Sequence, residues 1–178
     1  MADDNTIVEA IMRNTEQGFR MLFAKYKESL YWHVRRLLVA HDDAQDALQE
    51  TFLQVFKHIS TYNQTLSLKV WLLKIATNEA LRILYKNDNR LVSIDDNTAE
   101  LLNLKADEYV DFGNALSVRF QQAILALPLK QQIAFNLRYY DGFSYEEIAA
   151  ATESSAASAK QNYHIAKEKI VKYLKDNE

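Results

Sequence analysis

The chain has 178 residues, of which three are glycine, one is proline and none is cysteine, and its formal net charge is −3 at pH 7. The absence of cysteine excludes disulfides and thiolate metal sites and fits a reducing compartment such as the cytoplasm. The scarcity of glycine and proline and the lack of alternating Val, Ile and Thr runs predict an all-α protein, with neither a signal peptide nor an apolar run that could span a bilayer.

Two long amphipathic helices are expected first. One begins at Asn14 or Thr15, either of which can cap it, and carries an apolar and aromatic stripe as far as residue 38. The next begins at Asp42, where Gln45 can complete a capping box, and ends near Ile59.

The second of these helices has two distinct sides. Its inward side is apolar, whereas its outer side groups carboxylates and amides at i, i+3 and i+4. Such a side is usually a solvated helix face, and the alternative is a surface that docks a basic partner. The inward residues are Leu48, Phe52, Val55 and Phe56, and the outer ones are Asp43, Asp46, Gln49 and Glu50.

A third helix is expected from Leu68 to Lys86, with a basic outer side that the loop before it extends. Exposed aromatic and amide side chains can stack on and hydrogen-bond an unpaired base, whereas lysine and arginine hold phosphates. This combination favours single-stranded DNA over an ordinary lysine-bearing surface. The candidate residues are Tyr62, Asn63, Gln64 and Thr65 in the loop, and Lys74, Asn78 and Arg82 on the helix. The apolar face of the helix is expected at Leu68, Trp71, Leu72, Ile75 and Leu81 or the stem of Arg82.

The stretch Asp88–Gly113 is rich in Asp and Asn, has no sustained period and holds a net charge of −5, whereas residues 1–87 and 114–178 each hold +1. The excess acid therefore lies in the middle, and the flanking parts can present basic faces. This stretch is predicted to be a linker between two small helical domains, 1–87 and 114–178.

The C-terminal part is predicted to end in a helix-turn-helix, over Ser144–Lys169. Two shorter helices come before it, separated by a break at Leu127–Pro128. Ser144 and Glu147 form a capping box at the start of the first helix. In the second helix a buried stripe is expected, formed by Ala159, Tyr163, Ala166 and Ile170.

The opposite side of that second helix carries small, amide and basic side chains, which suit a recognition helix in a major groove. Gln161 can pair with an adenine edge, whereas Lys160, Lys167 and Lys169 are expected on phosphates. The alternative is a helical hairpin that does not bind DNA. The candidate duplex-binding residues are Ser154, Ser155, Ser158, Lys160, Gln161, His164 and Lys167.

Catalysis finds no support in the sequence. It contains no glycine-rich phosphate loop and no nucleophile elbow, and the histidines His33, His41, His58 and His164 have no metal-ligand spacing. The sequence therefore predicts a protein that is not an enzyme and that needs no metal or other cofactor.

With these features in place, the chain resembles the extracytoplasmic-function (ECF) group of bacterial sigma factors over about residues 7–175. The resemblance rests on four ordered motifs: FRMLFAKY at Phe19–Tyr26, DAQDALQETFLQVF at Asp43–Phe56, WLLKIATNEALR at Trp71–Arg82 and LPLKQQIAFNLRYYDGFSYEEIA at Leu127–Ala149. Two places where family members often have glycine, in the helix-turn-helix break and in the loop before the tryptophan, are near Glu153 and Gln64 here.

The resemblance implies a role that the residues alone would not indicate. Such proteins bind core RNA polymerase, through the clamp helices of its largest subunit and its flap, and recognise promoter DNA. By position, Asp46, Gln49, Glu50 and Phe52 would dock the polymerase, the Tyr62–Ser67 loop with Lys74, Asn78 and Arg82 would hold the melted −10 strand, and the helix near Ser155–Lys167 would read the −35 element. The linker would thread toward the RNA exit route. An anti-sigma factor, which in this family can be membrane-anchored, is the implied regulator, and no small-molecule substrate is implied.

Two other functions remain open from the residues alone. A free-standing helix-turn-helix repressor or activator would bind a roughly palindromic duplex without polymerase. A helical adaptor that binds only protein would show no dependence on DNA. The DAQDALQE helix, combined with the basic, amide-bearing helix after it, favours the sigma factor.

Overall fold

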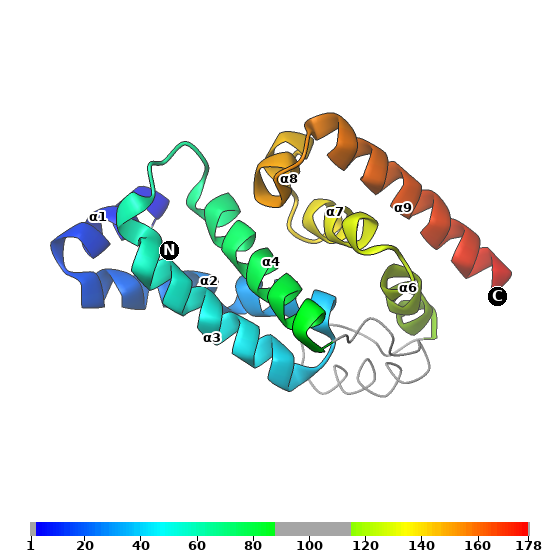
Figure 1. The fold of residues 1–178 in the computed structure, drawn as a ribbon, viewed down its shortest axis with the longest axis horizontal. Helices are drawn as coiled ribbons and strands as arrows, with labels where there is room; N and C mark the ends of the chain where they lie inside the picture. The colour runs from blue at the N-terminus through cyan, green and yellow to red at the C-terminus, as the bar shows by residue number, and fades with distance from the viewer. Residues whose placement is uncertain (1–2, 88–114, 178) are drawn as a thin grey trace. The chain divides into compact units, whose positions relative to one another are not determined.

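A computed structural model describes residues 3–87 and 115–177, which are helical and contain no strand, as the composition predicts. The chain divides into two compact units; of the described residues, the first comprises 3–86 and 150–152 and the second comprises 87, 115–149 and 153–177 (Figure 1). The predicted linker Asp88–Gly113 lies outside the described residues.

The first unit is built on α2 (Thr15–Leu38), the longest described helix. Asn14 caps it, since its side chain accepts a hydrogen bond from the amide of Gln17 at 3.1 Å, as predicted. Helix α3 (His41–His58) runs back along α2, and α4 (Leu68–Asn87) follows a short 3-10 turn, η1 (Ile59–Thr61), and an exposed loop (Figure 1).

The start of α3 differs from the prediction. The helix begins at His41 with Ala40 as its N-cap, and no side chain caps it, so the expected capping role of Asp42 is wrong. The reason lies in Val39, whose φ of 64° and ψ of −51° make a tight three-residue turn closed by a hydrogen bond from the amide of Ala40 to the carbonyl of Leu38 at 2.8 Å. Asp42 therefore lies within the first helical turn, where its charge interacts favourably with the helix dipole.

The sequence analysis did not identify α1 (Asp4–Arg13), which packs across α2. Ile7 and Ile11 are buried there, at the i, i+4 spacing that marks one helix face. The crossing point is Gly18 of α2, because a Cβ built at this position would lie 2.2 Å from the backbone nitrogen of Ile11. Only glycine permits this close approach of the two backbones.

A buried polar contact joins α2 to α4 inside the first unit. Nε2 of His33 lies 2.8 Å from the hydroxyl of Thr77, and that hydroxyl donates its proton to the carbonyl of Leu73 at 2.7 Å. The hydroxyl has one proton, so it must accept from His33, which fixes the imidazole with its proton on Nε2. His33 is thus a satisfied core histidine.

The face of α4 differs in part from the expected one. Leu68 and Leu72 are buried as predicted, but Trp71, Ile75 and Leu81 are only half-buried. The helix is turned so that its core side is formed by a broader set of small and apolar residues, which are Leu68, Val70, Leu72, Leu73, Ala76, Ala80, Ile83 and Leu84.

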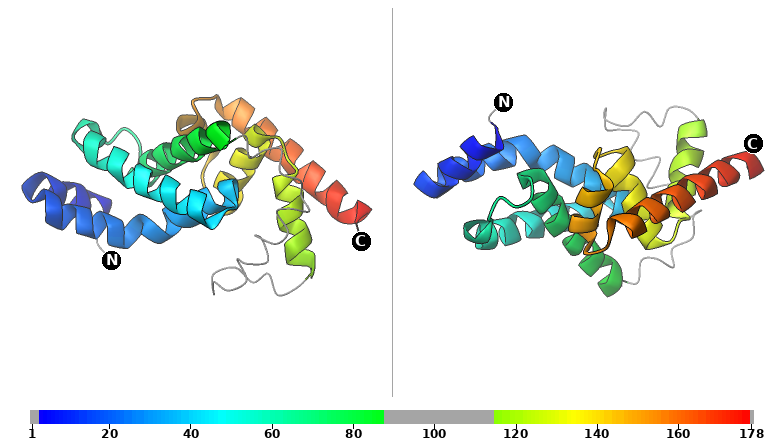
Figure 2. Two further views of the ribbon diagram at one scale, coloured as in Figure 1. Left: turned by 60° about the horizontal axis from the view of Figure 1, so that its bottom comes forward. Right: turned by 90° about the horizontal axis from the view of Figure 1, so that it is seen from above.

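The second unit contains α6 (Ala115–Leu125), α7 (Leu129–Tyr139), α9 (Ala156–Asp176) and α8 (Tyr145–Thr152) except its last three residues, and Figure 2 shows these helices from two further directions. Pro128 is the N-cap of α7, which places the break where the sequence predicts it. Side chains of α6, α7 and α9, with Leu127 from the turn between α6 and α7, form the core. Its buried members are Ala123, Ile124, Leu127, Phe135, Ala166 and Ile170, with Phe120, Tyr163, Tyr173 and Leu174 packed against them.

Candidate functional site

Helix α3 presents the predicted acidic and amide surface. Asp46 and Gln49 are exposed, whereas Glu50 is half-buried. Phe52 is half-buried as well, and its ring packs 4.9 Å from that of Phe23 on α2, so it lies at the edge of this surface. At 100° per residue, Asp46, Gln49 and Glu50 fall within one sector of the helix and are available to a single partner.

This surface continues into apolar side chains that sequence reasoning did not assign to it. Phe56 was expected to point inward with Val55, but Val55 is buried and Phe56 is 57% exposed, which corrects that expectation. Leu53 is 45% exposed and lies on the same side of the helix. Phe56 contacts the ring of Phe19 at 5.2 Å, so α2 supports it from one side while its other side faces solvent.

The loop before α4 is organised by its own side chains. The hydroxyl of Tyr62 donates to the carbonyl of Leu66 at 2.6 Å, and its half-buried ring lies 5.2 Å from that of Trp71. Oδ1 of Asn63 accepts from the amide of Thr65 at 3.2 Å and from its hydroxyl at 2.8 Å. Tyr62 therefore braces the loop, and the exposed candidates for contact with a base are Asn63, Gln64 and Thr65.

Gln64 has a φ of 61°, the left-handed region that favours glycine. The departure from the family pattern noted at this residue thus coincides with a conformation that costs free energy in any other residue. Strain of this kind is often retained where the side chain has a function.

On α4, the candidates Lys74, Asn78 and Arg82 follow one another at i, i+4 and i+8 and share one face. Asn78 and Arg82 are exposed, and Lys74 is half-buried. Nε of Arg82 donates to the Glu79 carboxylate at 2.7 Å, and this hydrogen bond and the charge of Glu79 raise the pKa of Arg82. Trp71 lies on the same face, at its loop end, although its hydrophobicity led the sequence analysis to place it in the core.

The helix-turn-helix forms as predicted. Oγ of Ser144 accepts from the amide of Glu147 at 3.1 Å, and the Glu147 carboxylate accepts from the amide of Ser144 at 2.8 Å. Helix α8 ends at Thr152, and its C-cap is Glu153, whose φ of 53° is again left-handed. The charged Glu153 therefore stands where a helix most often ends on glycine.

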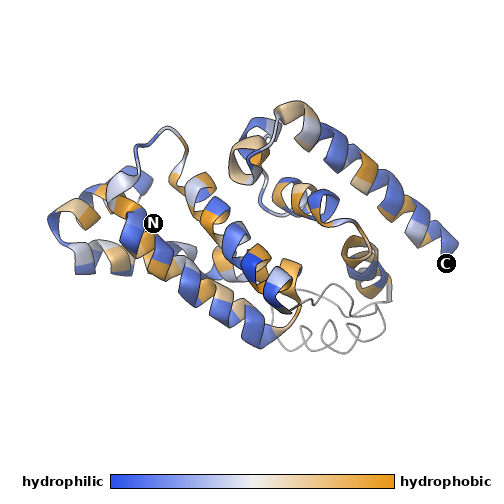
Figure 3. Ribbon diagram, viewed as in Figure 1, coloured by the Kyte–Doolittle hydropathy of each residue, from blue (hydrophilic) through white to orange (hydrophobic). Residues whose placement is uncertain are grey.

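Helix α9 buries the predicted stripe. Ala159, Ala166 and Ile170 are buried, and half-buried Tyr163 stacks its ring 5.8 Å from Phe135. In Figure 3, hydrophilic residues make up much of α9 and alternate along it with hydrophobic ones. Exposed among the duplex-binding candidates are Ser154, Ser155, Lys160, Gln161, His164 and Lys167.

Two of these serines have structural partners. Oγ of Ser155 caps α9 by accepting from the amide of Ser158 at 3.1 Å. Oγ of Ser158, which is half-buried, accepts from the side-chain amide of Asn162 at 3.4 Å. Gln161, His164 and Lys160 are therefore better placed than these serines to contact DNA.

Arg138 of α7 fixes the turn that leads into α8, a role that the sequence analysis did not assign. Its guanidinium donates to the carbonyl of Phe143 at 2.6 Å and lies 4.9 Å from the centre of the Tyr145 ring. The Tyr145 ring in turn lies 6.4 Å from that of His164. This contact supports the exposed imidazole from the side of α8.

In the part of the chain that the structure describes, no three His, Asp or Glu side chains are grouped as a metal site would require. No helix within those residues is both long and apolar enough to cross a membrane.

Comparison with known families gives two matches, one largely within each of the two compact units. Residues 22–90 match the family model described as sigma-70 region 2, and residues 117–170 match the model described as sigma-70, region 4. Together these matches cover more than half of the chain.

Curated relatives match along nearly the full length. The chain is 26% identical over 181 residues to RNA polymerase sigma-H factor of Pseudomonas aeruginosa, covering 96% of this chain and 93% of that protein. It is 27% identical over 176 residues to ECF RNA polymerase sigma-E factor of Escherichia coli strain K12, covering 94% and 92%.

Solved structures share the fold. The sigma factor RpoE in its complex with the anti-sigma factor NepR from Bartonella quintana matches with a TM-score of 0.69 at 22% identity, over 88% of this chain and 96% of that one. CnrH, solved in complex with the cytosolic domain of CnrY, matches with a TM-score of 0.75 at 19% identity, over 98% and 99%.

Proposed function

The chain belongs to the ECF group of the sigma-70 family. We propose that it is the promoter-recognition subunit of an RNA polymerase, in which separate helices bind the polymerase, the −10 element and the −35 element. It binds core RNA polymerase, recognises −10 and −35 promoter elements and promotes transcription initiation. The order of region 2 and region 4 in one chain carries this conclusion, because it pairs a polymerase-docking unit with a helix-turn-helix.

The polymerase contact is assigned to α3. Its exposed acidic and amide side chains, Asp46 and Gln49, with Glu50 beside them, would bind the clamp helices of the largest subunit. Exposed Phe56 and Leu53 would add apolar contact at the end of the same surface, with Phe52 at its edge. Protein interfaces commonly combine apolar contacts of this kind with polar groups.

The −10 strand is assigned to the loop before α4 and to the outer face of that helix. Asn63, Gln64 and Thr65 would hydrogen-bond an unstacked base, whereas Lys74 and Arg82 would hold phosphates on either side of Asn78. Tyr62 contributes by bracing the loop through Leu66 rather than by stacking on a base.

The −35 element is assigned to α9. Its exposed side presents Gln161 and His164 to base edges, with Lys160 and Lys167 toward phosphates. Ser155, which caps the start of this helix, is exposed as well.

Further features of the assignment follow from the family. The domain limits are 1–87 and 114–178, with the linker 88–113 running toward the RNA exit route and α6 to α9 meeting the flap. The protein acts in the cytoplasm with the polymerase, has no catalytic activity of its own and needs no cofactor. Control by an anti-sigma factor is proposed from the complexes in which the structural relatives were solved.

Two double variants of the full-length chain test the division of labour. Asp46→Ala with Gln49→Ala should weaken binding to core polymerase about tenfold or more and leave affinity for duplex −35 DNA unchanged, because interface contacts of this kind are worth about 1–3 kcal/mol. Lys160→Ala with Gln161→Ala should do the reverse. If both variants impair the same step, the assignment of α3 and α9 is wrong.

A further inference from the structure

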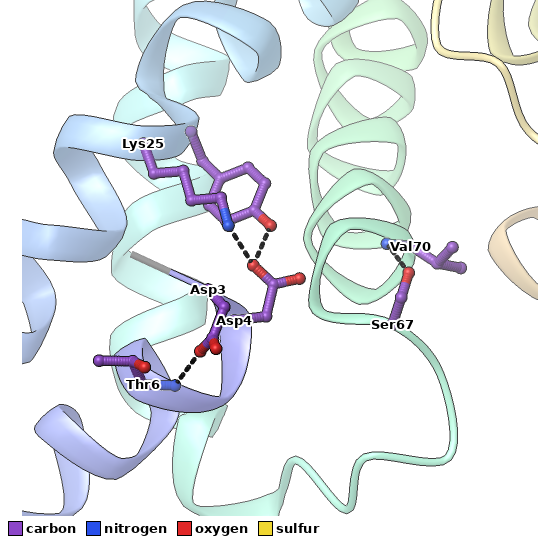
Figure 4. A network of polar contacts seen from close by, with 7 residues as sticks. Asp3, Asp4, Thr6, Lys25, Ser67 and Val70 are labelled. Carbon is purple, nitrogen blue, oxygen red and sulfur yellow. Dashed lines mark hydrogen bonds and ion pairs between the residues drawn. The ribbon is translucent and has the colours of Figure 1, made fainter. Parts of the chain in front are cut away.

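A cluster of polar contacts links the first turn of α1 to α2 (Figure 4). Oδ1 of Asp4 accepts from the hydroxyl of Tyr26 at 2.6 Å and from Nζ of Lys25 at 2.7 Å. The side chains of the ion pair are 33% and 22% exposed, and Tyr26 is buried. Two hydrogen bonds to one charged oxygen in a partly buried place fix the carboxylate firmly.

The rest of α1 fixes Asp4 independently of these bonds. Asp3 caps the helix by accepting from the amide of Thr6 at 2.7 Å. Ile7 and Ile11 are buried against α2, and the close approach at Gly18 sets how the two helices cross. Asp4 is therefore held in place both by the packing of α1 and by its bonds to Tyr26 and Lys25.

The same cluster adjoins the loop that precedes α4. In Figure 4, the side chain of Asp4 leaves the start of α1 and lies in the view between that helix and the segment of Ser67 and Val70, where α4 begins. Burial raises the pKa of Tyr62, and the charge of Asp4 raises it further, so the carboxylate is within electrostatic reach of the residue that braces the loop. Burial likewise raises the pKa of Tyr26, with contributions from Asp4 and then Tyr62.

Charge considerations indicate that this carboxylate has a geometric role. A carboxylate beside a surface that holds a DNA strand repels phosphates, and this repulsion weakens binding. Its ion pair with Lys25 offsets that repulsion locally. The paired carboxylate then serves as a fixed acceptor for the Tyr26 hydroxyl.

We propose that Asp4, through Tyr26 and Lys25, is a positioning residue for the loop Tyr62–Ser67 and thereby sharpens the discrimination among bases in the −10 strand. The inference rests on the proposed function of this loop. It makes α1, which lies before the matched region 2 segment, a working part of promoter recognition.

The test uses the full-length chain with core RNA polymerase and a set of promoters that carry each of the four bases at every −10 position. The readout is the ratio of initial transcription rates between the preferred base and the others. This ratio is independent of the fraction of protein that is folded, because a lower active concentration reduces all rates equally.

Three variants separate the contributions. Asp4→Ala removes both bonds, Tyr26→Phe removes the hydroxyl but keeps the ring, and Asp4→Asn keeps an acceptor without the charge. The matched control is Glu16→Ala, which breaks an exposed ion pair of α2 with Arg20 of the same 2.7 Å length and leaves the bonds of Asp4 intact.

Asp4→Ala and Tyr26→Phe should lower the selectivity ratio about threefold to tenfold at the position that the loop reads, the range that corresponds to the loss of one hydrogen bond of ordinary strength. Asp4→Asn should retain most of the ratio, and Glu16→Ala all of it. Unchanged ratios in both Asp4→Ala and Tyr26→Phe, or an equal loss in Glu16→Ala, would overturn the inference. A wild-type protein that supports no promoter-specific transcription would instead refute the proposed function.

Discussion

Replacing Gly18 by alanine sets two physical effects against each other. Alanine in the interior of α2 should stabilise the helix by about 0.5–1 kcal/mol relative to glycine. The new Cβ, however, would lie 2.2 Å from the backbone nitrogen of Ile11 and 2.5 Å from its Cα, so α1 must move. Backbone atoms cannot yield as a flexible side chain does, and overpacking of this kind costs about 1–3 kcal/mol.

The larger cost follows if α1 separates from α2. Ile7 and Ile11 are then exposed, and each loses about 1.5–3 kcal/mol of burial free energy. We expect a net loss of about 2 kcal/mol or more in the free energy of unfolding, since the lost packing exceeds the gain in helix propensity. Because α1 also carries Asp4, the variant should lose −10 base selectivity as Asp4→Ala does.

Urea unfolding followed by circular dichroism measures the effect. The control is Ala24→Gly, at an exposed position of the same helix, which calibrates glycine against alanine in α2 without any steric contribution. A Gly18→Ala protein that is more stable than wild type by the amount that Ala24→Gly loses would refute the close-packed crossing of α1 and α2.

Three further predictions concern the turn, the buried tyrosine and the recognition helix. Glu153→Gly should raise the stability of the second unit by about 0.5–1 kcal/mol, because glycine adopts the left-handed conformation without strain, and a lower melting temperature would contradict this. Since the pKa of Tyr26 is raised above its ordinary value of 10.0, its stabilising contribution is complete below that pH and is lost as the pH rises through the folded-state value. Tyr26→Phe should therefore make unfolding free energy fall less steeply above about pH 10, and parallel curves for the two proteins would exclude this role. Lys160→Ala should reduce the salt dependence of duplex binding by about 0.9 in the log–log slope, whereas Gln161→Ala should relax sequence preference at one base pair and leave the slope unchanged.

Much of the fold could be predicted because its signals are local. The capping box of Ser144 and Glu147, the cap at Asn14 and the stripe through Ala159, Ala166 and Ile170 each depend on residues within a few turns of one another. The structure confirms these predictions. In such segments the local hydrogen bonds and the burial of one helix face favour the same conformation.

The structure differs from the prediction where contacts between segments distant in sequence determine the conformation. The packing of α1 depends on Gly18, a residue that is unfavourable for a helix when only the local sequence is considered. Glycine is needed there because the backbones of α1 and α2 approach closely. Similarly, the turn at Val39 moved the start of α3 away from Asp42, although nothing in the side chain of valine favours a positive φ.

The candidate site divides in the same way. Residue types and helical spacing grouped Asp46 with Gln49 and Lys74 with Asn78, and these residues do share faces. Sequence reasoning could not show that the Tyr62 hydroxyl bonds the Leu66 carbonyl or that its ring packs against Trp71, since these contacts depend on the conformation of the loop.

Transcription reconstituted from core RNA polymerase and the purified chain, followed by sequencing of the transcript starts, tests the central claim most directly. Starts should lie at a fixed distance downstream of two shared sequence elements, and only when both the chain and the core enzyme are present. Failure of the chain to bind the core enzyme, or the same starts from the core enzyme alone, would contradict the account.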